Sequence, residues 1–318
     1  EDVWGVREAF GQKATTLALG SWTTMVSTVE GRDKMMKVIQ FSSRFMAWHC
    51  AARDPAAARR WTGLFKSSQE GRKSIRVLKA LNKVDQLFDE VPALSTPYEK
   101  ALVVAQQAGL AGHWHFDYLG HAHRAGFAER SHRELERIRR IPAFCWCVCN
   151  VAQILRGELA LRNAAAEITR VRRDLEALGP RDGAGEADAQ REARVTALEE
   201  ELRALRVQRF NGWVLLFKGV ADMACAGNMP GPELRRRFPA TFGWMNDGVV
   251  GAAGVFSALC VCFNHFPSSG ASVGGRQTEW QSNQTQRNAV GLAYGLVQLS
   301  ALVGASRAAP GGAEAKAQ

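Results

Sequence analysis

Apolar residues recur at intervals of three and four through most of the chain, which is the period of an α-helix that buries one side. In the segment 30–53, for example, the apolar positions are Met35, Val38, Ile39, Phe45, Met46 and Trp48. Alternating β-branched runs bounded by turn residues, which are typical of strands, are scarce. The pattern therefore predicts an all-α protein whose helices are separated by prolines and glycines.

One segment, 60–91, combines this periodicity with a stripe of positive charge. Its residues 71–84 read GRKSIRVLKALNKV, with five basic residues and no acidic one. At about 100° per residue, the steps of four, three and four from Arg72 to Lys83 place basic side chains on one helix face. We therefore predict an amphipathic surface helix. Its basic set is Arg72, Lys73, Arg76, Lys79 and Lys83, and its apolar set is Ile75, Leu78, Leu81, Val84 and Phe88.

Three uncharged runs are candidate membrane segments. The run 141–155 would cover about 22 Å as a helix, short of the roughly 30 Å hydrocarbon core, so a buried or re-entrant helix competes with a span. The run 248–266 has nineteen residues and is the strongest candidate. The run 289–306 is a possible second span, and for both of these the alternative is a buried helix of a soluble protein. Small residues that would allow close helix packing in the strongest candidate are Gly248, Ala252, Gly254 and Ala258.

The segment 157–210 differs in composition from its neighbours. It is rich in Ala, Arg, Glu and Leu, and the sequence GPRDGAG interrupts it at 179–185. Apolar residues step by three and four on both sides of this break, as in a coiled coil. We expect a solvent-exposed antiparallel helical hairpin. The chain then divides into regions 1–97, 98–156, 157–210, 211–266 (with the span 248–266) and 267–318.

The composition narrows the class of partner. The net charge of +10 favours an anionic partner such as nucleic acid or acidic lipid head groups. An apolar content of 46% excludes a disordered chain, and a mean hydropathy of −0.19 excludes a protein made mostly of membrane spans. Seven cysteines without a CxxC pair predict a reducing compartment.

No catalytic or cofactor motif is present in the sequence. Walker, nucleophile-elbow, HExxH and EF-hand patterns are all missing. The sequence HWHFDYLGHAH holds His113, His115, His121 and His123, but residues two apart on a helix point about 200° apart and cannot share one metal. The cysteines Cys145, Cys147 and Cys149 lie on an apolar segment and are expected to behave as small hydrophobes or acylation sites. We therefore expect no enzyme activity, no metal and no cofactor.

Three roles remain for the basic segment 60–91. Nucleic-acid binding lacks any accompanying motif, and the candidate membrane segments argue against it. A plain packed helix stays open as an alternative. An interfacial helix fits best, because apolar residues would enter one leaflet while the cations meet anionic phospholipid head groups. At roughly 1 kcal/mol per Lys or Arg, four aligned cations would contribute on the order of 4 kcal/mol.

Five segments follow one another along the chain: 32–48, 64–88, 103–127, 217–227 and 246–263. In their features and their order they resemble the peroxin-11 family of peroxisomal membrane proteins. The resemblance covers most of residues 30–265. The hairpin 157–210 is longer and more charged than the connecting region usual in the family, and 267–318 lies beyond the family's usual end.

The resemblance implies that the protein is integral to, or tightly associated with, the membrane of a peroxisome or of a glycosome-type peroxisome. It implies membrane elongation, peroxisome proliferation, self-association and recruitment of fission machinery. By position, the basic set would contact lipid phosphates and the apolar set would insert. A metabolite pore, or a non-enzymatic helical membrane scaffold, is the alternative function.

Overall fold

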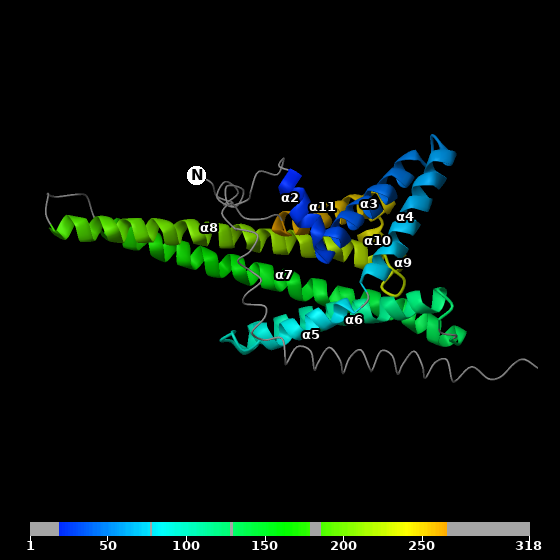
Figure 1. The fold of residues 1–318 in the computed structure, drawn as a ribbon, viewed down its shortest axis with the longest axis horizontal. Coiled ribbons are helices and arrows are strands. Elements are labelled where there is room, and N and C mark those ends of the chain that lie inside the picture. Colours follow the sequence, from blue (N-terminus) through cyan, green and yellow to red (C-terminus); the bar gives the residue numbers. More distant parts are fainter. Residues whose placement is uncertain (1–18, 77, 128–129, 179–185, 266–318) are drawn as a thin grey trace, which may run out of the picture.

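The computed structural model describes residues 19–76, 78–127, 130–178 and 186–265, and Figure 1 shows how its helices are arranged. Within these ranges the regular secondary structure is helical and no strand occurs, which confirms the all-α prediction. The possible span 289–306 and the rest of 267–318 lie outside the described residues.

The first two long helices form an antiparallel pair. The short helix α2 (Leu19–Ser27) leads into α3 (Val29–Cys50), and α4 (Pro55–Ile75) packs back along α3. Polar caps define both helix starts: the Thr28 side chain accepts a hydrogen bond from the Gly31 amide, and the Asp54 side chain accepts one from Ala57.

The next helices are α5 (Lys79–Glu90), α6 (Pro97–Arg124) and α7 (His132–Ala177). The two longer helices, α6 and α7, each begin with a capping box, formed by Thr96 and Glu99 in α6 and by Ser131 and Glu134 in α7. The helix α5 packs on α6, and α6 packs on α7. The segment expected as one helix over 60–91 is thus divided between α4 and α5.

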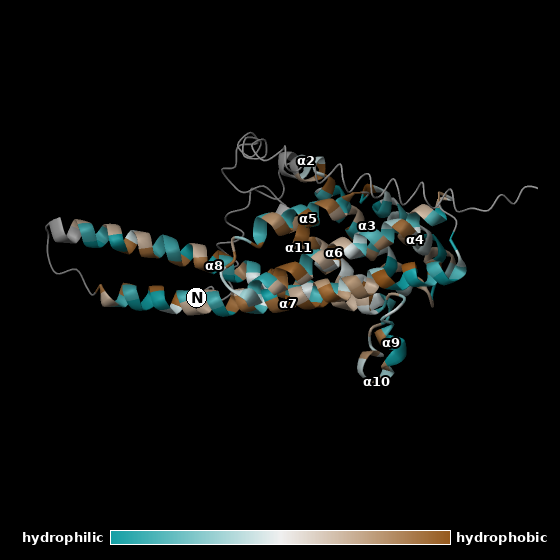
Figure 2. Ribbon diagram, turned by 90° about the horizontal axis from the view of Figure 1, so that it is seen from below, coloured by the Kyte–Doolittle hydropathy of each residue, from teal (hydrophilic) through white to brown (hydrophobic). Residues whose placement is uncertain are grey.

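The longest helices form an antiparallel hairpin. The helix α8 (Glu186–Gly227) runs back along α7, and their shared end projects beyond the other helices (Figure 1). Ile168, Val171 and Leu198 are buried between the two helices, and charged residues cover the outside. Figure 2 shows the change along α7, which is hydrophilic toward the free end and more hydrophobic beside the other helices. The hairpin therefore includes the predicted charged segment 157–210 but extends beyond it at both ends, to His132 on α7 and to Gly227 on α8.

The last described helix completes the helical body. After the single turns α9 (Leu234–Arg237) and α10 (Pro239–Phe242), the helix α11 (Asp247–His265) packs against α3 and α8. A Cβ atom at Gly251 would lie 2.7 Å from the backbone nitrogen of Phe45, so glycine permits the close approach of α11 to α3. Phe41, Cys225 and Val250 form one small apolar cluster at this junction.

Candidate functional site

The basic segment changes direction between α4 and α5. The helix α4 ends at Ile75, and Leu78 before α5 has a φ of 62°, a left-handed conformation that is uncommon for a residue other than glycine. The Lys79 amide donates a 3.0 Å hydrogen bond to the Arg76 carbonyl across the turn. The turn separates Arg72 and Arg76 from Lys79 and Lys83, which a continuous helix would have aligned on one face.

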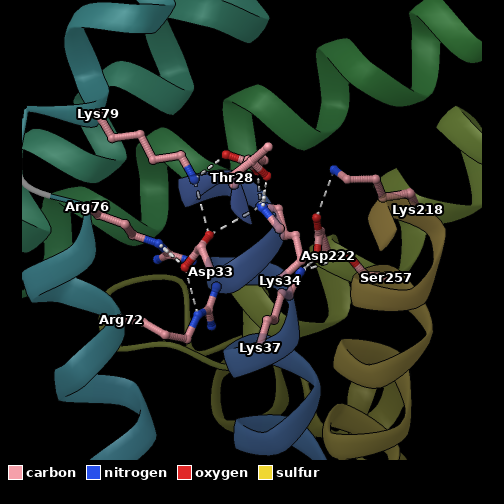
Figure 3. A network of polar contacts seen from close by, with 12 residues as sticks. Thr28, Asp33, Lys34, Lys37, Arg72, Arg76, Lys79, Lys218, Asp222 and Ser257 are labelled. Atoms are coloured by element: carbon pink, nitrogen blue, oxygen red, sulfur yellow. Dashed lines mark hydrogen bonds and ion pairs between the residues drawn. The ribbon is translucent and has the colours of Figure 1, made fainter. Parts of the chain in front are cut away.

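Three cations of the basic set converge on one carboxylate of α3, as Figure 3 shows. The Arg72 Nε lies 3.0 Å from the Asp33 Oδ1, the Arg76 Nε 2.9 Å from the same oxygen, and the Lys79 Nζ 3.2 Å from Oδ2. Asp33 is fully buried, which alone would raise its pKa. The positive charges of Arg76, Lys34 and Lys79 outweigh this effect and hold the pKa of the carboxyl well below its usual range.

The two other cations of the basic set also have partners inside the fold. The Lys73 Nζ lies 2.8 Å from a carboxylate oxygen of Glu70 and 3.7 Å from one of Asp117 on α6. Lys83 donates to Gln86, and its Nζ lies 5.9 Å from the ring centroid of Trp114. In this conformation the basic set therefore does not form the outward face that the sequence predicted, because acidic and aromatic groups of α3, α4 and α6 bind it.

The apolar set is divided between the interior and the surface. Ile75, Leu81 and Val84 are half-buried, whereas 48% of Leu78 and 67% of Phe88 is exposed. The exposed pair lies at the two ends of α5, which packs against α6. The structure thus presents part of the apolar set outward and most of the basic set inward.

A second buried ion cluster joins α3, α8 and α11. The Asp222 Oδ1 lies 2.7 Å from the Lys37 Nζ, and the Asp222 Oδ2 lies 3.1 Å from the Lys218 Nζ. The Ser257 hydroxyl donates a 2.6 Å hydrogen bond to Asp222 and lies 2.8 Å from the Lys37 Nζ. Burial would raise the pKa of Asp222, but the two lysines outweigh burial and lower it. Burial lowers the pKa of Lys37 despite its carboxylate partner.

Neither ion cluster followed from the sequence pattern. The local signals were one pair four residues apart on a helix in each cluster, Glu30 with Lys34 and Lys218 with Asp222. The partners of Asp33 come from α4 and from the start of α5, about forty residues further along the chain. Such long-range partners have no signature in a single sequence.

The histidines of HWHFDYLGHAH do not come together. His113 is buried, and its Nδ1 lies 3.0 Å from the carbonyl oxygen of Pro142 on α7. The His121 Nδ1 instead lies 3.1 Å from a carboxylate oxygen of Glu70. Among the described residues no three His, Cys, Asp or Glu side chains are placed to hold a metal ion.

Among the described helices, α7 is the one whose length and apolar composition would allow it to cross a membrane. Only 28% of its apolar window is buried, which is low for the core helix of a soluble protein. The exposed side chains Phe144, Val148 and Val151 lie on one face of it. The helix α7 contains the predicted apolar run 141–155.

The predicted span 248–266 corresponds to α11. Within the described residues, the apolar part of α11 (Asp247–Phe263) is too short to count as a membrane span. Gly248, Gly254 and Ala258 are buried, with both glycines against aromatic side chains of α3. Ala252 is exposed beside Phe256 and Leu259 on the opposite face. Three of the four predicted packing residues therefore face neighbouring helices, and Ala252 does not.

Comparisons with known proteins give a family match over most of the chain. A family model described as Peroxisomal biogenesis factor 11 (PEX11) matches residues 19–264. The Peroxisomal membrane protein 11-1 of Oryza sativa subsp. japonica is 24% identical over 264 residues, which cover 82% of this chain and 96% of that protein. No solved structure matches this chain.

Proposed function

The chain belongs to the peroxisomal biogenesis factor 11 family and is a peroxisomal membrane protein of peroxisome proliferation, and we propose that it acts by deforming the membrane with α4 and α5. In this proposal the segment binds anionic phospholipids and inserts its apolar side chains into one leaflet. Insertion on one side expands that leaflet and favours positive curvature, which elongates the organelle. Self-association and recruitment of fission machinery would follow on the elongated membrane.

The exposure of Leu78 and Phe88 is the observation that supports this mechanism. Phe88 lies on the same face of α5 as the half-buried Leu81 and Val84, at spacings of three and four, and the exposed Leu78 continues this face at the start of the helix. Fully burying a side chain of this size in an apolar phase contributes about 1.5–3 kcal/mol. A membrane surface offers such a phase for both exposed residues without any change in the fold.

Contact between the basic set and lipid requires a rearrangement. Arg72, Arg76 and Lys79 are bound to Asp33, so they reach lipid phosphates only if α4 and α5 separate from α3. Anionic head groups then replace the carboxylates, at roughly 1 kcal/mol for each cation near the surface. Membrane binding thus proceeds in two stages: the exposed apolar residues insert first, and the cations exchange partners afterwards.

The test uses the full-length protein with anionic liposomes, whose shape is recorded by electron microscopy. The variants Leu78→Glu and Phe88→Glu place a charge on the inserting surface and are expected to abolish tubules while leaving the thermal unfolding temperature unchanged. The matched control is Phe127→Glu, because Phe127 is 72% exposed but lies in the turn after α6. Tubulation by Leu78→Glu and Phe88→Glu at the wild-type level would show that α5 does not insert.

A further inference from the structure

A cavity of about 130 Å³ lies where α3, α4, α6, α7 and α8 meet. Cations from three of these helices line it, among them Lys37, Arg72 and Lys218. Asp117 and Asp222 are the acidic residues in its lining. The cavity lies between the two ion clusters described above.

The buried charges around this cavity do not balance. Glu30 and Asp33 are shared by four cations, and Asp222 is shared by two. Six cations therefore contact three carboxylates in the two clusters, an excess of three positive charges. Lys37, Arg72 and Lys79 are buried, and the other three cations are partly buried. Glu30, Asp33 and Lys79 lie just outside the cavity lining, and Asp117 within the lining pairs with a further cation, Lys73. An uncompensated buried charge is costly, and a bound anion is the direct means of compensation. The six cations are Lys34, Lys37, Arg72, Arg76, Lys79 and Lys218.

An independent feature of the same cavity is a buried asparagine side chain without hydrogen-bond partners. Asn150 of α7 lines the cavity and is 0% exposed, yet neither its Oδ1 nor its Nδ2 has a hydrogen-bond partner among the described residues. Buried polar groups are nearly always hydrogen-bonded, and leaving one unpaired costs about 1–3 kcal/mol. An Nδ2 group beside an excess of cations is suited to donate to the oxygen of an anion.

The volume of the cavity limits the ligand. An engineered cavity of about 150 Å³ in another protein holds a benzene molecule of six heavy atoms. The inner cavity is therefore large enough for a phosphate group and too small for a nucleotide. A second cavity of about 540 Å³ shares Gln69, Lys73, Asp117 and Met229 with the first, so the remainder of a larger phosphate ester has space beside it.

We propose that the inner cavity is a binding site for a phosphate group, held by Arg72, Lys37 and Lys218 and by the amide of Asn150. Arginine and lysine together suit such a ligand, since guanidinium offers paired donors and ammonium a compact charge. The ligand is inorganic phosphate, or the phosphate monoester of a lipid head group that enters through the outer cavity. The site is present in the conformation in which Arg72 is bound to Asp33, so its occupancy can be tested without insertion of α5 into a membrane.

The first measurement is thermal unfolding of the full-length protein in a neutral detergent, with ionic strength held constant by potassium chloride. Inorganic phosphate at tenfold its Kd is expected to raise the unfolding temperature by about 2–5 °C. Short-chain phosphatidic acid is compared with short-chain phosphatidylcholine. A rise with inorganic phosphate supports a site for the free group, and a rise with phosphatidic acid alone supports a lipid head group. The absence of a rise with either ligand overturns the proposal.

Asn150→Asp tests the same site without any added ligand. A carboxylate at this position supplies the missing negative charge, so the variant is expected to unfold at a higher temperature than wild type and to lose its response to phosphate. Asn163→Asp is the matched control, because Asn163 is exposed on the same helix; it should behave like wild type. Asn150→Leu removes the amide and is expected to weaken phosphate binding about tenfold. A lower unfolding temperature for Asn150→Asp with a wild-type phosphate response would overturn the proposal.

Discussion

The Lys37 Nζ lies 2.7 Å from the Asp222 Oδ1 although the two residues are 185 positions apart in sequence. This ion pair joins the first long helix of the body to the helix that returns from the hairpin, and Ser257 adds α11 to the same point. Both charged side chains are almost completely buried. The pair therefore ties together helices from the two ends of the described chain.

Removal of Asp222 should destabilise the protein severely. Asp222→Ala leaves Lys37 and Lys218 buried without their carboxylate, and breaking a buried pair in this way costs about 3–5 kcal/mol. Denaturant unfolding in detergent measures the loss. The control is Asp247→Ala, whose carboxylate is 60% exposed and pairs with Arg44, so its loss should stay below about 1 kcal/mol. Equal effects of the two variants would contradict the assigned burial.

Acid should weaken the fold through Asp33 and Asp222. The pKa of both carboxyls is lower in the folded protein than the ordinary value of 3.8, so the folded state binds their protons less readily than the unfolded state. Their stabilisation is complete above the unfolded pKa and is lost as the pH falls from about 4 through the folded pKa. The melting temperatures of wild type and Asp33→Asn should therefore differ at neutral pH and approach each other progressively as the pH falls below about 4. A difference that stays constant over this range would contradict the prediction.

Asp33→Asn should also increase membrane binding if α4 and α5 act as proposed. The substitution removes the charge that binds Arg72, Arg76 and Lys79, so these cations exchange more readily to lipid phosphates. Co-sedimentation with anionic liposomes is expected to rise about fivefold for each cation released, and the gain should vanish at high salt. A salt-independent gain, or none, would indicate that the cations stay inside the fold on the membrane.

Close packing between α3 and α11 gives a further prediction. Gly251→Ala places a Cβ atom 2.7 Å from the Phe45 backbone nitrogen, which cannot move aside as a flexible side chain would. Overpacking of this kind costs about 1–3 kcal/mol in thermal or denaturant unfolding. The adjacent control Ala252→Leu adds a larger group on the exposed face and should change stability by less than about 0.5 kcal/mol.

Local sequence patterns were sufficient to predict the all-α class and the helical hairpin, but not the turn that divides the segment 60–91 into α4 and α5. The all-α class follows from spacings of three and four, and the sequence break at GPRDGAG separates the predicted arms of a hairpin, as α7 and α8 are separated in the structure. The helix starts at Thr28, Thr96 and Ser131, which the structure shows, are equally local, because each side chain caps an amide three residues further along. These features depend on residues within one or two turns of each other, and a single sequence displays them directly.

Tertiary structure decided where the charges point. The periodicity of 72–83 predicted one helix with an outward basic face, but the turn at Leu78 divides the segment and the carboxylate of Asp33 directs its cations inward. The same holds for Lys37 and Asp222, and for the cavity beside Asn150. A buried charge is stable only beside a partner, and here the partners come from helices dozens to nearly two hundred residues away. Only the folded arrangement of the helices brings those partners within reach.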